Sequence, residues 1–408
     1  MIALADCNNF FASCERSIHP ELEGKPIVVL SNNDGCIIAR SNEAKALGYK
    51  MGEPVFKVKD KLLREKVHMF SANVSLYRAI SQKIMQILSI ECNTMEVYSI
   101  DEAFMDFTDV AAPDEKAILL REQVLRETKI PISIGIAKTK VLAKLASTIA
   151  KKHTSTGVFL LNKKDLIERA LRYFPIEDLW GVGSKHAKML NEKGVFQASQ
   201  LAKMDEAWLR KYMNIGGVRL ARELNEISCS RLVETHAAKK SIMSSRSFKQ
   251  ELTSLADLNE SLTNFASLCA YKLRKQKSCA KKLGVFIQTN RFKPEAKKHN
   301  GYIEVIFSTA TNDSIEVVKA THKALEQLYQ SDCLYKRAGV IVSDIIPESV
   351  VQLSLFSKHN ITKRTALMKV YDSLNSKMGQ GTLRLSVQGT EKDWSPSKEP
   401  IAFGNTLE

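Results

Sequence analysis

Asp101 and Glu102 form an acidic pair between two short runs of strand character, Met95–Ile100 and Ala103–Phe107. Neighbouring side chains on one straight strand point to opposite faces, so the two carboxylates would diverge there. At the turn of a hairpin both can reach the same side, where their repulsion is costly unless a cation binds between them. The pair is therefore either a solvated acidic turn, which is a common feature, or part of a cation site.

A third carboxylate, Asp6, ends the first predicted strand, Ile2–Asp6. An aspartate at a strand end is a frequent position for binding metals or phosphates, although Asp is also a common turn residue. If residues 20–75 are an insertion, the remaining elements run β-α-β-β-α-β, the order of a ferredoxin-like sheet. In that topology the first strand and the 95–107 hairpin are neighbours. We therefore expect Asp6, Asp101 and Glu102 to converge on one site.

The insertion and the segment after the sheet carry further polar signals. Within 20–75 we expect strands at Pro26–Leu30 and Cys36–Ala39 and a helical turn at Asn42–Leu47. A helix over 138–152 buries one apolar face and places Lys140, Lys144 and Lys151 in a basic stripe. Such a stripe is either a solvated surface or a site that neutralises phosphate.

The carboxyl-terminal half reads as a DNA-binding helical segment followed by a second mixed unit. Gly181-Val-Gly183 lies between predicted helices, as in a helix–hairpin–helix motif that offers backbone N–H groups to a DNA phosphate. Ile215-Gly-Gly-Val218 is a looser second copy. After a polar linker at 231–240, residues 239–345 repeat the β-α-β-β-α-β order. Beyond about residue 347 no fold is assigned. There, Gln352–Phe356 is either a strand end or an anchor peptide for a partner.

Composition limits the functional class. The 408 residues are 44% hydrophobic and carry a formal charge of +15, which supports folded domains, about two to four in number, and a polyanionic partner. The eight cysteines include no Cys-x-x-Cys pair, which argues against a zinc cluster and for a reducing interior. No apolar run approaches the roughly 18 residues of a membrane span, and no signal peptide is evident. A cytoplasmic nucleic-acid protein, with no membrane association, is expected.

The chain resembles the Y-family translesion DNA polymerases, and within them the UmuC-type subunits. The resemblance covers nearly the whole chain and is carried by long strings in the same order: Asp6–Glu15, Val28–Arg40, Glu43–Gly48, Tyr98–Phe104, Gly135–Ala146, Trp180–Gly183 and Ser245–Phe248.

The resemblance implies an α+β, multidomain, right-hand polymerase with small fingers. Its ferredoxin-like palm would comprise residues 1–19 and 76–165, and the fingers 20–75. A helical thumb with the helix–hairpin–helix would span 166–230, with the linker at 231–240. A ferredoxin-like little finger would follow at 241–346. The region 347–408 would then hold a peptide that docks on the sliding clamp, formed by Gln352, Leu353, Leu355 and Phe356.

The resemblance also implies the catalytic chemistry. Asp6, Asp101 and Glu102 would hold two Mg²⁺ ions, or Mn²⁺ in their place, with the backbone carbonyl of Cys7 as a further oxygen ligand. One ion would activate the primer 3′-hydroxyl and the other would neutralise the triphosphate and the leaving pyrophosphate. No Ser/His/Asp triad or P-loop competes for this role.

The nucleotide site is implied around the fingers. Phe11 stands at the position of the family's steric gate, whose ring would clash with a 2′-hydroxyl. Its neighbour Phe10 is included in the same nucleotide site, but a packing role is expected for it rather than that of the gate. The triphosphate would meet Asn42, Lys45 and Lys151. The family commonly has tyrosine and arginine at the positions of Asn42 and Lys45, and a lysine cannot reproduce the bidentate contact of arginine. An acid found in many relatives is replaced by Asn8, which is not needed to hold metal.

The implied macromolecular partners are primer-template DNA with its incoming deoxynucleotide, the sliding clamp, a UmuD-like dimer and the RecA filament. DNA contacts are expected at Gly181, Gly183, Lys185, Lys239, Lys240 and Arg246. The expected function is error-prone synthesis past damaged bases in the SOS response, in the cytoplasm at the nucleoid. The alternatives are a DinB-type polymerase that acts alone, a DNA-binding scaffold without catalysis and, more remotely, a nucleotide cyclase on the same palm topology.

Overall fold

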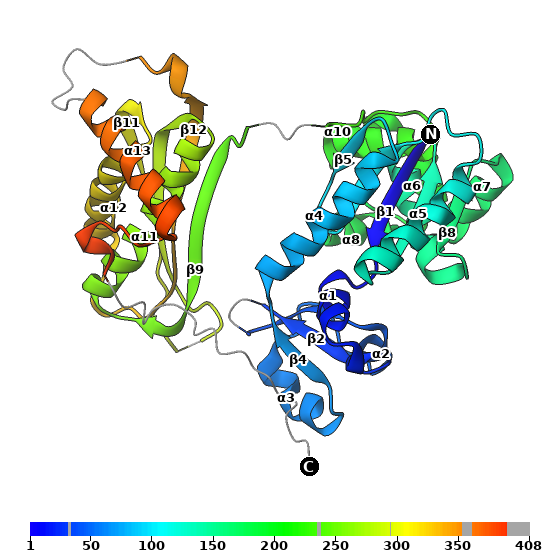
Figure 1. Cartoon of the computed structure of the whole chain (residues 1–408), viewed down its shortest axis with the longest axis horizontal. Coiled ribbons are helices and arrows are strands. Elements are labelled where there is room, and N and C mark those ends of the chain that lie inside the picture. Colours follow the sequence, from blue (N-terminus) through cyan, green and yellow to red (C-terminus); the bar gives the residue numbers. More distant parts are fainter. Residues whose placement is uncertain (32–33, 235–237, 294, 353–360, 390–408) are drawn as a thin grey trace. The chain divides into compact units, whose positions relative to one another are not determined.

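The computed structural model describes residues 1–31, 34–234, 238–293, 295–352 and 361–389, and these fall into two compact units that divide after residue 236 (Figure 1). Each unit has its own hydrophobic core, so each is considered by itself. In the described residues, no helix has the length and apolar character needed to cross a membrane.

A five-stranded sheet forms the centre of the first unit. Its order is β5-β6-β1-β7-β8, from β1 (Ile2–Cys7), β5 (Met95–Val97), β6 (Glu102–Asp106), β7 (Ile132–Ala137) and β8 (Val158–Leu161). β1 lies antiparallel between β6 and β7. The first four strands confirm the ferredoxin-like order and the adjacency of β1 to the hairpin. The parallel edge strand β8 was not expected.

Helices cover both faces of this sheet. One face packs on α1 (Phe10–Ile18), α4 (Val74–Ile90) and α5 (Pro113–Thr128), and the other on α6 (Lys140–His153). Gly135 of β7 permits a very close approach of α6, since a Cβ atom there would lie 1.9 Å from the backbone nitrogen of Ser147. The side chains of α6 are therefore held close to the sheet.

The inserted segment forms its own three-stranded sheet with a separate core. The sheet order is β3-β2-β4, from β2 (Ile27–Leu30), β3 (Ile37–Arg40) and β4 (His68–Ser71), with α2 (Asn42–Ala46) and α3 (Val55–Arg64). The first two strands and the helical turn were expected. α3 and β4 were not, although β4 pairs in parallel with β2 and completes the sheet.

A helical segment completes the first unit. It consists of α7 (Lys164–Tyr173), the short η2 turn (Ile176–Asp178), α8 (Ser184–Glu192), α9 (Ala198–Ala202) and α10 (Glu206–Leu224). The Gly181–Gly183 turn joins η2 to α8, as a helix–hairpin–helix requires. α10 is interrupted at Asn214 (φ 57°, ψ −165°), so the looser second glycine pair begins a new helical half rather than a separate helix.

The second unit has the expected order of elements along the chain, but its strands do not lie side by side in the ferredoxin-like order of the first sheet. It runs through β9 (Ser241–Leu252), α11 (Leu255–Lys275), β10 (Ser278–Thr289), β11 (Asn300–Thr311), α12 (Ser314–Leu328) and β12 (Tyr335–Pro347). The sheet order is β11-β10-β12-β9, which places the last strand beside the first. The core lies between this sheet and α11 and α12.

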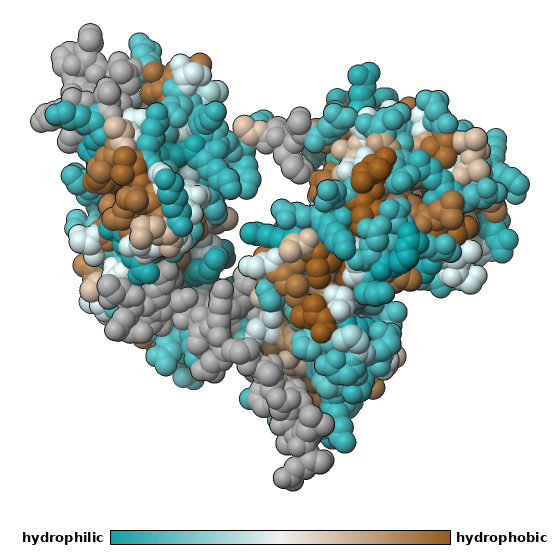
Figure 2. Space-filling view, viewed as in Figure 1, coloured by the Kyte–Doolittle hydropathy of each residue, from teal (hydrophilic) through white to brown (hydrophobic). Residues whose placement is uncertain are grey.

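A helix that the sequence did not reveal, α13 (Ile361–Met378), packs on the second unit and is followed by the η4 turn (Ser386–Gln388). Two ion pairs fix it, Arg274 to Asp372 at 2.7 Å and Arg364 to Asp313. Large apolar side chains of this helix remain exposed, including Leu367 at 51% and Val370 at 56%, and Figure 2 shows apolar surface over α13. Met368 is buried while these other apolar residues are exposed, so the helix has no continuous apolar face and hydrophobic periodicity did not indicate it.

Replacing Asp372 by Ala is expected to destabilise the second unit by about 3 kcal/mol, because it leaves the Arg274 guanidinium buried without its carboxylate. Both guanidinium bonds to Asp372, at 2.7 and 2.8 Å, would be lost. Thermal unfolding measures the change. Glu206→Ala is the control, since it removes an equally bidentate but exposed pair with Arg222 and should change stability far less. Equal effects of the two substitutions would contradict this account of α13 docking.

Candidate active site

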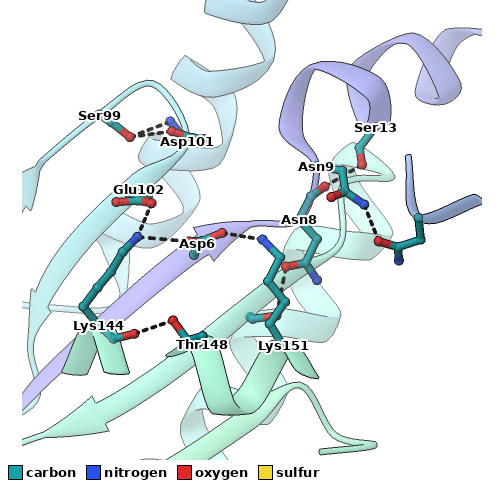
Figure 3. A network of polar contacts seen from close by, with 12 residues as sticks. Asp6, Asn8, Asn9, Ser13, Ser99, Asp101, Glu102, Lys144, Thr148 and Lys151 are labelled. Atoms are coloured by element: carbon teal, nitrogen blue, oxygen red, sulfur yellow. Dashed lines mark hydrogen bonds and ion pairs between the residues drawn. The ribbon is translucent and has the colours of Figure 1, made fainter. Parts of the chain in front are cut away.

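Asp6 and Glu102 face each other across neighbouring strands. They are register partners between β1 and β6, and their side chains are only 16% and 15% exposed. The Lys144 ammonium of α6 lies between them, 3.2 Å from Asp6 Oδ2 and paired with Glu102 Oε1 (Figure 3). Lys151 Nζ approaches the other Asp6 oxygen at 3.0 Å. Two carboxylates thus share one enclosed space with a cation.

The lysine stripe of α6 is turned toward the sheet, although Lys151 at its end is also exposed to solvent. Lys140 Nζ lies 2.6 Å from Glu96 on β5, and its side chain is only 5% exposed. With Lys144 and Lys151 on Asp6 and Glu102, each of the three lysines meets an acidic side chain of the sheet. The interpretation of the stripe as a solvated surface is therefore wrong.

Asp101 comes close in the chain, but its carboxylate is turned aside. Its backbone carbonyl accepts a hydrogen bond from the Cys7 N–H at 2.9 Å, and its side chain accepts one from the Ser99 hydroxyl (Figure 3). Among the described residues, no group of three or more His, Cys, Asp or Glu side chains is arranged to hold a metal. The structure brings together Asp6 and Glu102, two of the three expected acids.

The electrostatics of this pair favour a bound cation. Burial alone would raise the pKa of Asp6, but the ammonium groups of Lys151 and Lys144 hold it below its usual value. Burial raises the pKa of Glu102 in spite of its contact with Lys144. Burial, with the nearby charges of Asp101 and Asp6, raises the pKa of the Cys7 thiol. Cys7 therefore stays a thiol, and its carbonyl is the group suited to a hard cation.

The Phe11 ring is held rigidly next to the site. It stacks on Tyr77 of α4 with ring centroids 4.5 Å apart and an interplanar angle of 17°. Tyr77 is fully buried and donates its hydroxyl hydrogen bond to Glu15. Phe10, by contrast, is 4% exposed and belongs to the palm-side core. Its burial agrees with the expected packing role, and its inclusion among the nucleotide contacts stays a prediction.

Polar groups of the inserted sheet approach the same region. Lys45 on α2 bonds to Asn9 Oδ1, and Asn9 Nδ2 donates to Asn42 Oδ1 at 2.9 Å. Burial lowers the pKa of Lys45, and the positive charges of Lys151 and Arg40 lower it further. Three cationic groups therefore share this region. Sequence analysis did not single out Asn9, Arg40 or the bridging role of Lys144, and only the lysine spacing on α6 gave a signal.

Asn8 takes a structural role. Its side-chain oxygen accepts a hydrogen bond from the Ser133 hydroxyl at 3.0 Å, and its backbone carbonyl accepts one from Ser13 at 2.6 Å. These bonds tie the start of α1 to β7. The absence of an acid at this position leaves Asp6 and Glu102 unaffected.

The expected DNA contacts of the first unit lie on its surface. Gly181, Gly183 and Lys185 are exposed at the turn before α8 and in its first turn. Gly181 adopts φ +96°, a conformation that side chains other than glycine rarely allow. The expected contact of this turn with phosphate stays a prediction.

In the second unit, Arg246 does not lie on the open face of the sheet. It lines a cavity of about 300 Å³ with α11 and the segment after α13, on the same side of β9 as the core residue Phe248. On the open face, the Arg337 guanidinium lies 5.6 Å from the Phe286 ring centroid and bonds to Ser245 Oγ at 3.0 Å. Arg337 is therefore an arginine that the open face presents, and the DNA contact expected at the exposed Arg246 stays a prediction.

The remaining expected contacts lie at the ends of the second unit. Lys239 and Lys240 are exposed just before β9. Gln352 is exposed after β12, while Leu353, Leu355 and Phe356 of the expected docking peptide lie outside the described residues.

Replacing Tyr77 by Phe is expected to lower stability by about 2 kcal/mol at pH 8 and by less at pH 5. Burial raises the pKa of Glu15 above its usual 4.5, and the Tyr77 hydroxyl opposes that shift. A group with a raised folded-state pKa contributes stability below its unfolded pKa and loses it as the pH rises through the folded value. Without the hydroxyl, the ionised Glu15 costs more at pH 8.

Urea unfolding at both pH values measures this difference. Tyr49→Phe is the matched control, because the acceptor of its hydroxyl, Glu65, is 30% exposed and remains hydrated. The same pH dependence in both variants would exclude Glu15 as the cause.

Comparisons with known proteins find matches along most of the chain. Residues 5–148 match the impB/mucB/samB family, residues 239–355 match the C-terminal domain of that family, and residues 365–400 match a domain of unknown function. Protein UmuC of Salmonella typhimurium is 38% identical over 98% of this chain and 97% of its own length. Protein ImpB of Salmonella typhimurium is 36% identical, with 98% and 96% covered.

More distant relatives and solved structures extend the comparison. DNA polymerase IV of Oceanobacillus iheyensis is 28% identical over 93% of this chain and 89% of its own. A Y-family DNA polymerase chimera of Dbh and Dpo4 has a TM-score of 0.67 at 22% identity, covering 85% of this chain and 100% of that one. DinB from Sulfolobus solfataricus has a TM-score of 0.52 at 23% identity, with the same coverage. These structures show a shared fold.

Proposed function

The chain belongs to the impB/mucB/samB family of Y-family DNA polymerases, and we propose that Asp6, Asp101 and Glu102 carry its nucleotidyl transfer. It is an error-prone translesion DNA polymerase of SOS mutagenesis. The observation that supports the site is the pairing of Asp6 with Glu102 across β1 and β6 around a cationic group.

The donor set fits a divalent metal. Asp6 and Glu102 offer carboxylate oxygens in an enclosed space that already accepts an ammonium group, and Cys7, whose carbonyl is a further oxygen donor, follows Asp6 in the chain. Hard oxygen ligands suit Mg²⁺, and Mn²⁺ can take its place. Two such ions would lower the pKa of the primer 3′-hydroxyl and neutralise the leaving pyrophosphate. Asp101 would join the set when its carboxylate leaves Ser99.

The lysines around these acids serve the triphosphate. Lys151 and Lys45 bring positive charge to the same region, where burial and then the charges of Lys151 and Arg40 lower the pKa of Lys45. An anionic triphosphate would relieve that repulsion. Asn42 fixes Asn9, which in turn fixes Lys45, so the expected Asn42 assignment becomes one of positioning.

Phe11 selects the sugar. Its ring is backed by Tyr77, which is itself buried and hydrogen bonded, so the ring cannot retreat from a 2′-hydroxyl. Deoxynucleotides are thereby favoured over ribonucleotides.

DNA binding is assigned to both units. In the first, the Gly181–Gly183 turn and Lys185 contact the phosphate backbone. In the second, Lys239, Lys240 and Arg337 supply positive charge, which suits salt-dependent contact with the backbone. We retain palm (1–19 and 76–165), fingers (20–75), thumb (166–230), linker (231–240), little finger (241–346) and carboxyl-terminal region (347–408) as the domain assignment.

The proposed partners follow from the UmuC-type relatives. Gln352, Leu353, Leu355 and Phe356 would dock on the sliding clamp, and a UmuD-like dimer and the RecA filament would complete the active complex at the nucleoid in the cytoplasm. Identity of 38% to Protein UmuC, against 28% to a DNA polymerase IV, favours this assignment over a DinB-type enzyme that acts alone.

Primer extension across an abasic site, with and without a UmuD-like dimer, tests the proposed function. We expect little synthesis by the purified chain alone and at least about tenfold more with the dimer, because the UmuC-type assignment makes the chain one subunit of a larger enzyme. Undamaged template is the control. Full bypass without the dimer would support the DinB-type alternative, and no extension of either template under any condition would contradict polymerase activity.

A further inference from the structure

Three aromatic rings join the thumb turn to the loop that carries Asp101. Trp180 stands immediately before Gly181, and its indole N–H donates to the Tyr98 hydroxyl at 3.1 Å. The two rings meet edge to face, with centroids 5.5 Å apart at 88°. Phe104 contacts both, at 5.7 Å from Tyr98 and 5.8 Å from Trp180. The contact connects segments that are 82 residues apart in the sequence.

On the palm side, Tyr98 is part of the loop that positions the acids. Its backbone N–H donates to the Glu102 carbonyl at 3.0 Å, and the Ser99 N–H donates to the same oxygen at 3.1 Å. The Ser99 hydroxyl holds the Asp101 carboxylate. Phe104, fully buried, follows Glu102 by two residues on β6. A displacement of Tyr98 is therefore transmitted to Asp101 through one short hydrogen-bonded loop.

On the thumb side, Trp180 begins the turn that offers N–H groups to a phosphate. Val182, the middle residue of the turn, is 8% exposed and bonds back to the Leu179 carbonyl at 3.0 Å. The turn is thus anchored in the thumb core, while the Trp180 ring reaches out to the palm. A shift of the turn on binding DNA would move the indole N–H relative to Tyr98.

Stability alone does not account for this contact. Tyr98 is 46% exposed, so its hydroxyl is accessible to water whether or not Trp180 is present. An exposed hydrogen bond of this kind contributes at most about 1 kcal/mol. Its removal should leave the fold intact, which makes a functional effect separable from a structural one.

We propose that Trp180 and Tyr98 are positioning residues that couple the thumb's contact with DNA to the geometry of the Asp101 loop. This inference rests on the proposed function, in which the turn binds the DNA backbone and Asp101 joins Asp6 and Glu102. Neither side chain touches the reacting atoms. They join the turn to the loop of residues 98–101, so that the position of the turn on bound primer-template sets the conformation of the loop and with it the direction of the Asp101 carboxylate.

Tyr98→Phe, Trp180→Phe and the double variant test the coupling, because each keeps an aromatic ring and removes one partner of the hydrogen bond. We expect kcat for single-nucleotide insertion to fall about tenfold in either single variant and no further in the double variant. KM for the nucleotide, the Kd for primer-template and Tm should stay unchanged. Tyr173→Phe, which alters an exposed thumb tyrosine of α7, is the control and should match the unaltered protein.

Additive losses in the double variant, an unchanged kcat in both single variants, or a loss confined to the Kd for DNA would each overturn the coupling. Asp101→Ala in the same assay distinguishes a failure of the coupling from a failure of the proposed active site. If Asp101→Ala is inactive while Tyr98→Phe keeps the original kcat, the coupling fails and the active site stands. If Asp101→Ala is fully active, the proposed site itself fails.

Discussion

Replacing Asp6 by Asn or Glu102 by Gln is expected to slow primer extension by about 10³-fold or more. Each substitution keeps the size of the side chain and removes one negative charge from the pair that faces Lys144. A neutral amide is a poor ligand for a divalent cation, so neither the 3′-hydroxyl nor the triphosphate would be correctly placed. Single-nucleotide insertion at saturating primer-template measures the loss.

Asp106→Asn is the matched control for these variants. Asp106 lies on the same strand as Glu102, four residues along, and its carboxylate bonds to Thr108. Its loss should leave extension unchanged. DNA binding and Tm of the Asp6 and Glu102 variants should remain close to the original, because Lys144 can still donate to an amide oxygen. Full extension by either variant would show that the chemistry lies elsewhere in the chain, whereas no extension by the original protein would support a DNA-binding scaffold.

Replacing Phe11 by Ala is expected to reduce the preference for deoxynucleotides over ribonucleotides by about 10²-fold. The ring is fixed by its stack on Tyr77, so its removal opens space that no neighbouring side chain refills. The gain should appear in kcat/KM for ribonucleotides, with a smaller change for deoxynucleotides. Parallel single-nucleotide insertion with both substrates gives the ratio.

Phe10→Ala separates a sugar gate from general disturbance of α1. Phe10 is the adjacent residue but is buried in the core, so its removal should cost about 3 kcal/mol of stability without changing the sugar ratio. An unchanged ratio in Phe11→Ala, or an equal change in both variants, would assign Phe11 a packing role only.

The arrangement of Asp6 and Glu102 could be predicted from the sequence because it follows from topology. The alternation in Ile2–Asp6 and the hairpin at 95–107 indicated two strands, and the split order of elements made them neighbours. The direction of the Asp101 carboxylate, by contrast, does not follow from topology. It is decided by one hydrogen bond to Ser99 inside a four-residue loop, which no periodicity reports.

The direction of the lysine stripe could not be predicted for a related reason. Val141, Leu142 and Leu145 of α6 are buried in a core shared with the thumb, so the helix is enclosed on more than one side. A rule that places charges opposite the apolar face assumes one buried face. On α6, Lys140 and Lys144 are enclosed as well, against Glu96 and Glu102, while the more exposed Lys151 still reaches Asp6. Likewise, α13 docks through Arg274 and Asp372, and although Met368 is buried, several of its other large apolar residues stay on the surface.

Direct binding of Mn²⁺ tests the central claim, that Asp6 and Glu102 hold a metal where Lys144 now lies between them. Free Mn²⁺ can be followed by electron paramagnetic resonance during titration of the protein with primer-template and a nucleotide that cannot be extended. We predict saturable binding by the original protein and by Asp106→Asn, and at least about a tenfold weaker Kd in Asp6→Asn and Glu102→Gln. Equal affinity and stoichiometry in all four proteins would contradict the claim.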